Sequence, residues 1–424
     1  MVVADDGAGE EVRAWCKWQL VASLSRSVAS MCLMPVVPIV VAALHGDPSK
    51  VAEHNADLTF WGSGLQILLF PFFAVLSDRF GRKPFLCGCG AAQAAWCAMV
   101  CVAHDRIGPR MFLVADIANR SAALLAVVLT NAALGDVVPP SSLASAVGRH
   151  TGVAFGASML CGPPIGTFAH ARLGGVPAAA GLAFAFALLS LLVQSVVVRE
   201  SLAKPARSGS LQLRGVNPAS GLCLVFRGGG ARLALLGCAH GLFKITAGEQ
   251  VLYSAFMLDV WGLGTRGIAL STMLVGVAVA LGQAAVVATL SRRLGAARAL
   301  DIALWAAIFQ RVCFGFFAAR SRALAALSLL VGMPSFGFDA LIGQLATEAT
   351  GGSIAKGELM AALNSVSTVA VLLSSKLLAW LFVRGNAVGM SGAPFLFGAA
   401  CCVASLIAAR TGRRPGVDPK PKAS

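Results

Sequence analysis

Long apolar runs recur along the whole 424-residue chain, and a short polar stretch separates each from the next. A helix that crosses a bilayer needs about 20 mostly apolar residues, so runs of this length predict membrane spans. Twelve spans are predicted, at residues 20–44, 57–77, 84–103, 111–134, 148–170, 176–198, 232–257, 267–289, 299–319, 323–347, 358–383 and 391–410. The pattern indicates an all-α integral membrane protein.

One longer polar segment divides these runs into two groups of six. It is rich in Arg, Gly, Ser and Pro, a composition typical of an exposed linker. The predicted order is an N-terminal segment (1–19), a six-helix bundle (20–198), the linker (199–231), a second six-helix bundle (232–410) and a disordered basic tail (411–424). The acidic N-terminus is unlike the basic start of a cleavable signal, so we expect the first helix to be retained.

Composition supports the membrane assignment and excludes other classes. Hydrophobic residues make up 57% of the chain and charged residues 12%, against roughly 25% charged in ordinary soluble domains. The net charge of +15 does not indicate nucleic-acid binding, because the basic residues separate apolar runs instead of forming a patch with aromatics. The 12 cysteines lie mostly inside those runs without metal-site spacing, as expected of small apolar core residues.

The distribution of Lys and Arg predicts the orientation. If the termini and the linker share one side of the membrane, that side carries 21 basic residues and the other carries eight. Basic residues concentrate on the cytoplasmic side of membrane proteins, so both termini and the linker are expected in the cytoplasm. No lipidation, retention or peroxisomal signal indicates which membrane holds the chain.

A short repeat supports the division into halves. Residues 76–81 read LSDRFG and residues 290–295 read LSRRLG, each in the loop after the second helix of its half. Equivalent placement of a repeated segment is what a duplicated six-helix unit produces.

The first of these loops continues as Asp78, Arg79, Phe80, Gly81, Arg82 and Lys83. The glycine permits a sharp turn and the three cations hold it at the cytoplasmic face. This stretch resembles the signature loop between helices two and three of the major facilitator superfamily, with Ala74 where that pattern has its first glycine. The resemblance implies two pseudo-symmetric six-helix bundles, and a latch of one half against a helix of the other, in which a helix N-terminus or an arginine satisfies Asp78. The alternative is a solvated topology signal.

A second motif lies in the predicted fifth span, where Gly162, Pro163 and Gly166 resemble the Gly-Pro-x-x-Gly-Gly motif of proton-coupled antiporters. Small residues and prolines there favour a hinge or a seal between the halves, and packing glycines are the alternative. Weaker similarities to the same family lie at Gly135-Asp136, at Arg199 to Leu202 and at Asn217-Pro218. Together they look most like the branch with the tetracycline/proton antiporters and the hippocampus-abundant-transcript-like proteins.

Ionisable residues inside spans need a partner, a water-filled cavity or a function. Eight lie within the predicted spans: Arg26, Asp116, Arg120, Lys244, Glu249, Arg311, Asp339 and Lys376. Asp116 and Arg120 are one helical turn apart and are expected to pair, whereas Lys244 and Glu249 lie about 140° apart on their helix.

All of these except Arg26 and Lys376 are candidates for the proton or substrate site, and Glu249 is the preferred proton site of the second half. Gln250 and Tyr253 join it in a predicted polar patch. The excess of cations favours an anionic substrate, unless Arg26 and Lys376 snorkel to the interface.

These observations predict a monomeric secondary transporter that moves a small solute across a lipid bilayer, with proton-coupled antiport as the leading mechanism. The proton is the expected coupling ion, and no cofactor, metal or nucleic acid is expected. A symporter or facilitator for a sugar or organic anion is the alternative, and a non-transporting receptor or scaffold a more distant one. An enzyme is not expected, because no HExxH or GxSxG motif occurs.

Overall fold

The computed structural model describes residues 6–138, 140–202, 219–228, 230–317, 319–351, 354 and 356–413. Within these ranges the chain is helical and has no strand. Eight helices are long and apolar enough to cross a membrane, and a bent pair, α13 with the segment from Met333 to Thr350, makes a ninth. All twelve predicted spans fall on helical segments, several of them broken, so the all-α prediction is confirmed.

The helices are Asp6–Leu33 (α1), Val37–His45 (α2), Lys50–Phe80 (α3), Arg82–Ala103 (α4), Pro109–Val137 (α5), Pro140–Arg172 (α6), Gly175–Leu192 (α7), Ser220–Cys223 (α8), Gly230–Ile245 (α9), Glu249–Asp259 (α10), Thr265–Leu281 (α11), Ala288–Phe317 (α12), Arg322–Val331 (α13), Phe338–Thr350 (α14), Lys356–Ala387 (α15) and Ala393–Thr411 (α16). Short 3-10 or π segments connect some of them, at Val193–Val197 (η1), Leu224–Gly228 (η4), Thr246–Gly248 (η5), Gly282–Val287 (η6) and Met333–Gly337 (η7).

The described residues divide into two compact units. Those within 1–50, 68–216 and 263–276 form the first unit, and those within 51–67, 217–262 and 277–424 form the second. The division differs from the predicted bundles, because residues 51–67 of α3 group with the second unit and residues 263–276 group with the first. The two ends of a long helix can pack against different neighbours. A domain boundary drawn at one point of the sequence cannot describe such a helix.

Two predicted segments differ from their expected structure. Helix α1 begins at Asp6, so residues 6–19 extend the first helix instead of preceding it. The indole nitrogen of Trp15 donates to the carbonyl of Arg199 at 2.9 Å and fixes this extension. In the predicted linker, residues 220–228 form α8 and η4. Residues 203–218 of the linker and 414–424 of the tail lie outside the described residues.

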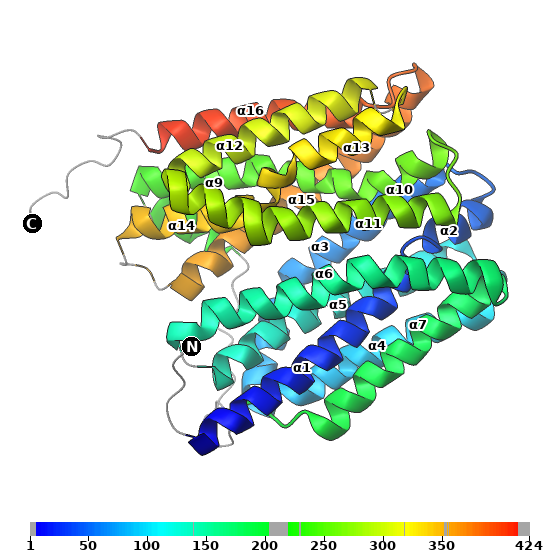
Figure 1. Cartoon of the computed structure of the whole chain (residues 1–424), viewed down its shortest axis with the longest axis horizontal. Coiled ribbons are helices and arrows are strands. Elements are labelled where there is room, and N and C mark those ends of the chain that lie inside the picture. Colours follow the sequence, from blue (N-terminus) through cyan, green and yellow to red (C-terminus); the bar gives the residue numbers. More distant parts are fainter. Residues whose placement is uncertain are drawn as a thin grey trace, which may run out of the picture. The chain divides into compact units, whose positions relative to one another are not determined.

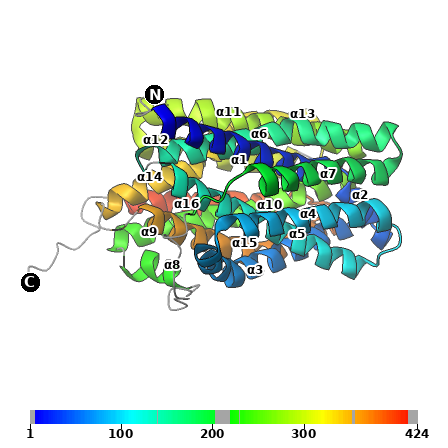
Figure 2. The same cartoon turned by 90° about the horizontal axis from the view of Figure 1, so that it is seen from below.

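In the first unit, α1 lies between α6 and α7, and these three helices run side by side (Figure 1). The view from below places α4 next to α5 (Figure 2). Close approach of α6 to α1 depends on small residues: a methyl group at Gly162 would overlap Met31, and one at Gly166 would overlap the backbone of Cys32. These glycines therefore pack two helices of one unit, which is the alternative reading of the motif around Pro163.

In the second unit, α16 runs beside α12 and α9 (Figure 1). Their apolar core contains, among others, Leu236, Leu300, Leu304, Ile342 and Leu406. One polar contact recurs in both units. The hydroxyl of Ser190 donates to the carbonyl of Ala22 at 2.7 Å, and that of Ser405 donates to the carbonyl of Ala239 at 2.8 Å. The same serine contact between the first and sixth helices of each half supports an internal duplication.

The repeated loops have the same backbone turn. Gly81 has φ 99° and ψ 160°, and Gly295 has φ 79° and also ψ 160°. This conformation is almost confined to glycine, since a side chain there costs about 1–3 kcal/mol. The turn joins α3 to α4 in one unit and bends α12 in the other.

We expect Gly81→Ala to lower the apparent unfolding temperature of the purified protein, because the alanine strains the turn by about 1–3 kcal/mol. Differential scanning fluorimetry in detergent measures this. Gly88→Ala is the matched control, since Gly88 lies on the exposed face of α4 with no atom near the added methyl group. Equal stability of Gly81→Ala and wild type would show that the turn tolerates a side chain.

Candidate functional site

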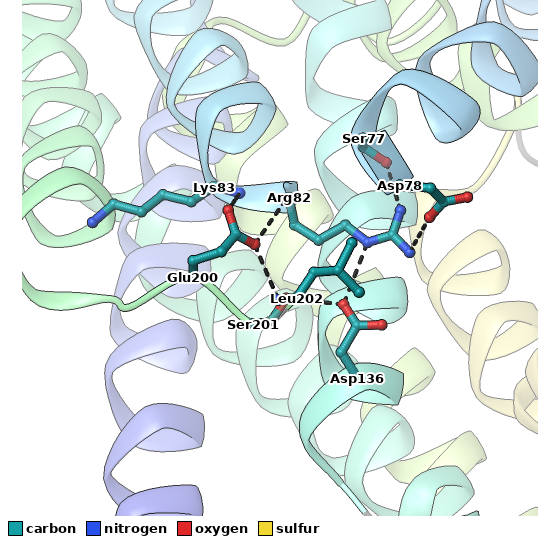
Figure 3. Close-up of polar contacts among 8 residues, drawn as sticks. All are labelled: Ser77, Asp78, Arg82, Lys83, Asp136, Glu200, Ser201 and Leu202. Carbon is teal, nitrogen blue, oxygen red and sulfur yellow. Dashed lines mark hydrogen bonds and ion pairs between the residues drawn. The ribbon is translucent and has the colours of Figure 1, made fainter. Parts of the chain in front are cut away.

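The loop between α3 and α4 is a network of ion pairs and hydrogen bonds centred on Arg82 (Figure 3). Its guanidinium lies 2.5 Å from Asp78 Oδ1 and 3.4 Å from Asp136 Oδ2, and it donates to the Ser77 hydroxyl at 2.5 Å. Asp78 ends α3 and Asp136 ends α5, so one arginine joins three helices. Charge-assisted contacts of this kind are stronger and more directional than neutral hydrogen bonds.

Glu200 completes the network from the far end of the first half. Its carboxylate accepts from the backbone N–H of Arg82 at 2.8 Å and of Lys83 at 3.1 Å (Figure 3). These are the first two residues of α4, whose amides have no partner within the helix. The next residue, Ser201, donates to Asp136 at 3.0 Å. A carboxylate at a helix N-terminus also interacts favourably with the helix dipole.

The predicted signature residues have unequal roles here. Asp78 pairs with Arg82, one turn further along in the same unit, and the latch between the halves that the resemblance implies stays a prediction. Lys83 joins through its backbone, while its ammonium group points away from the network (Figure 3). Arg79 lies over the ring of Phe80. In the sequence, Asp136 and Glu200 were only weak matches to the family pattern. They are far apart along the chain, so the sequence did not show that both contact Arg82.

In the second unit, Glu249 and Arg311 form a buried ion pair. Arg311 Nε lies 3.0 Å from Glu249 Oε2, and its Nη2 donates to the Thr246 hydroxyl at 2.6 Å. The side chains are 4% and 12% exposed. A methyl group at Gly398 on α16 would overlap the carboxylate, and the ring of Phe243 lies beneath the guanidinium. The pair therefore joins α10 to α12 and sits tightly against α16.

Lys244 and Asp339 form a second pair, which joins α9 to α14. Lys244 Nζ donates to Asp339 Oδ2 at 2.7 Å, and His240 Nδ1 lies 3.9 Å from the other carboxylate oxygen. The Asp339 side chain is 59% exposed, whereas that of His240 is 5% exposed. Asp339 lies in the first turn of α14, directly after η7, where the helix dipole favours a carboxylate. This cluster is thus far more accessible than the Glu249 pair.

The remaining candidates separate into two kinds. Tyr253 packs edge-on against Phe314 and near Phe395, in the aromatic interior of the second unit. The predicted polar patch with Glu249 is therefore packed inside that unit, and the side chain of Gln250 lies outside the described residues. In the first unit, Asp116 is buried on α5 and interacts electrostatically with Arg120 one turn away, as predicted.

Sequence reasoning missed the partner of Lys376. Snorkelling of Lys376 was left open, and in the structure its ammonium group pairs with Asp57 on α3, within the second unit. Asp57 stands at the start of a predicted span and was counted as an end residue. Its spacing from an apolar run carries no signal of a partner more than 300 residues away.

Comparisons with known proteins agree with this architecture. The profile of the Major Facilitator Superfamily matches residues 20–375. The class G tetracycline resistance protein of Vibrio anguillarum is 28% identical over 281 residues, which cover 63% of this chain. The chain spans 65% of the length of that relative.

Two solved structures share the fold. The human organic anion transporter MFSD10 (TETRAN) superposes with a TM-score of 0.69 at 19% identity, over 94% of this chain and 99% of that one. The nucleoside transporter NupG, as its D323A mutant, superposes with a TM-score of 0.71 at 11% identity, over 94% and 100% of the two chains. At these identities the similarity establishes the fold alone.

The Glu200 cap generates a stability prediction. Glu200→Ala should destabilise the protein by about 1–2 kcal/mol, because two N–H groups at the start of α4 lose their acceptor. Thermal unfolding in detergent measures the change. Glu348→Ala is the control: among the described residues, that carboxylate accepts a hydrogen bond from Gln344 alone, on the exposed face of its own helix. If both variants unfold alike, the contact in Figure 3 contributes nothing to stability.

The Glu249 pair generates a second prediction. Arg311→Met should destabilise the protein by about 3–5 kcal/mol, because it leaves a buried carboxylate without its cation. Adding Glu249→Gln to that variant should recover most of the loss. Arg199→Met is the control, because the side chains of Arg199 and of its partner Glu11 are 83% and 80% exposed. A surface ion pair of this kind contributes at most about 1 kcal/mol. A double variant no more stable than Arg311→Met would contradict the pairing.

Proposed function

The chain belongs to the Major Facilitator Superfamily and is a multi-pass membrane protein, and on this premise we propose that it is a secondary active transporter of a small solute. Family membership also agrees with the expectation that it is not an enzyme. In the proposed cycle a central site opens alternately to the two sides of the membrane, and proton movement drives solute flux. The excess of basic residues on the side of the termini supports cytoplasmic termini.

One observation carries the proton-coupling proposal: Asp339 is paired with Lys244 and is nevertheless 59% exposed. An acid that can reach water and also face a cation can alternate between two states. While it is ionised, it pairs with the lysine; when it takes up a proton, the lysine is released to another anion. His240, 3.9 Å away, is a third titratable group at the same place.

The geometry favours Asp339 over Glu249 as the proton-exchanging group, which changes the preference drawn from the sequence. The Glu249 carboxylate is 4% exposed, contacts Arg311 through both oxygens and has no room on its α16 side. A carboxylate held in this way suits a structural tie between helices. Asp116 in the first unit stays a second candidate, because it is buried next to a cation.

Antiport is the proposed direction of coupling because the segment from Gly162 to Gly166 resembles the motif of proton-coupled antiporters. The class G tetracycline resistance protein is similar over 63% of this chain. The extent of that match leaves the substrate open. A symporter or facilitator would have the same fold, and the behaviour of Asp339 under a proton gradient separates these mechanisms.

We expect Asp339→Asn to abolish pH-gradient-driven flux in proteoliposomes, down to the level of empty vesicles, because the asparagine cannot take up or release a proton. Solute exchange without a gradient should continue. The assay screens anions, sugars and lipophilic drugs, and follows the lumenal pH at the same time.

Glu249→Gln and Asp116→Asn are run in parallel, and Asp47→Asn, in the loop between α2 and α3, is the control. Loss of driven flux in Glu249→Gln alone would move the proton site there. Flux that ignores both the gradient and all three substitutions would identify a facilitator and overturn proton coupling.

A further inference from the structure

One cation inside the predicted spans, Arg26, has no carboxylate that compensates its charge among the described residues. Five cations lie within the predicted spans: Arg26, Arg120, Lys244, Arg311 and Lys376. Three of them form an ion pair with a carboxylate in their own unit: Lys244 with Asp339, Arg311 with Glu249, and Lys376 with Asp57. A fourth, Arg120, interacts electrostatically with Asp116 one turn away. The second unit is therefore neutral at these positions, and the excess positive charge of the first unit resides at Arg26.

Arg26 is enclosed by protein. It lies on α1, six residues after the start of the predicted span 20–44. The residue is 7% exposed. A guanidinium buried in this way without a counter-charge costs several kcal/mol.

Within the described parts of the chain, the Arg26 guanidinium has no ion pair and no hydrogen bond. The hydrogen bonds at this residue use its backbone: Gln93 Nε2 donates to the carbonyl at 2.9 Å, and Ser30 donates to it at 3.5 Å. The side-chain oxygen of Gln93 is itself buried without a partner, and the guanidinium does not engage it. The five N–H donors of a buried arginine thus stay available.

The surroundings of Arg26 are polar. Gln19, Ser23, Arg26 and Ser30 follow one another at helical spacing and form a polar stripe along α1. The three neutral members each bond a different helix of the same unit: Gln19 bonds Thr130 on α5 at 3.3 Å, Ser23 bonds His150 on α6 at 3.0 Å, and Ser30 bonds Gln93 on α4 at 2.7 Å. None of these hydroxyl, imidazole and amide groups supplies a negative charge, so the polar stripe leaves the charge of Arg26 for an anion to compensate.

We propose that Arg26 binds the anionic group of the transported solute, so that the substrates are organic anions bearing a carboxylate, sulfonate or phosphate. The guanidinium matches the two oxygens of such a group bidentately. Loading the anion supplies the missing counter-charge, and releasing it exposes an uncompensated cation again. A neutral or cationic solute would leave Arg26 unsatisfied. This assignment rests on the proposed transport function and names its substrate class.

Binding to the purified full-length protein tests the assignment without any gradient. The probes are benzoate, benzenesulfonate and phenyl phosphate, with benzamide as the neutral analogue of benzoate, and calorimetry and thermal shift report binding. The wild type should bind at least one anion and ignore benzamide. Arg26→Met should weaken anion binding at least about tenfold, which corresponds to loss of a charge-assisted contact.

The same variant distinguishes a ligand-binding from a structural arginine. Arg26→Met should unfold at the temperature of the wild type or above it, because no partner is lost and a buried charge is removed. Arg311→Met, in which a paired arginine of similar burial is lost, should unfold at a lower temperature. A pronounced loss of stability in Arg26→Met would indicate a structural role and overturn the assignment.

Arg26→Lys keeps the charge and loses the bidentate geometry, so its anion affinity should fall between those of the wild type and Arg26→Met. It also decides the case if Arg26→Met does not fold, since unchanged affinity in Arg26→Lys contradicts the proposal. Wild-type protein that binds none of the anions, or binds benzamide equally well, overturns it directly, and so does displacement of every probe by millimolar chloride alone. Anion binding that persists while driven flux is absent would instead overturn proton coupling and leave Arg26 in place.

Discussion

The cost of placing charge inside an apolar helix bundle constrains this structure more than any other factor. Three ion pairs within the second unit join helices that are distant in the sequence: Arg311 to Glu249, Lys244 to Asp339, and Lys376 to Asp57. Breaking the first of them would leave a buried charge, so that contact restricts how the helices can rotate or slide against one another. Apolar packing alone does not impose such a restriction, because lipid tails are as apolar as the side chains.

The two halves share their backbone features and differ in their charges. The turns at Gly81 and Gly295 have nearly the same conformation, and the serine-to-alanine-carbonyl contact occurs once in each unit. Four residues after each of those alanines stand Arg26 in one half and Phe243 in the other. The ring of Phe243 lies against Arg311, which already has its carboxylate. Duplication thus preserved the scaffold, while the ionisable groups diverged.

The sequence was informative about helices and much less so about partners. Runs of about 20 apolar residues are a one-dimensional signal, and the predicted spans lie on helical segments. The sequence did not predict that α1 begins at Asp6, because hydropathy marks the apolar part of a helix and not its polar end. Pairing depends on helix rotation and neighbours, which spacing along the chain does not encode. The sequence could predict the contact of Asp116 with Arg120 because both lie on one helix. It could not predict the pair of Lys376 with Asp57, which lie on different helices.

Exposure separates ion pairs that hold the fold from those suited to function. The Glu249 carboxylate is closed in by Arg311, Thr246 and α16, so exchange of a proton or an anion there would require helices to separate. Asp339 is open to exchange while it still faces Lys244. Arg26 shows the opposite imbalance, a buried cation among polar groups that carry no negative charge. In the proposed transporter, Arg26 of the first unit binds the anion and Asp339 of the second unit exchanges the proton.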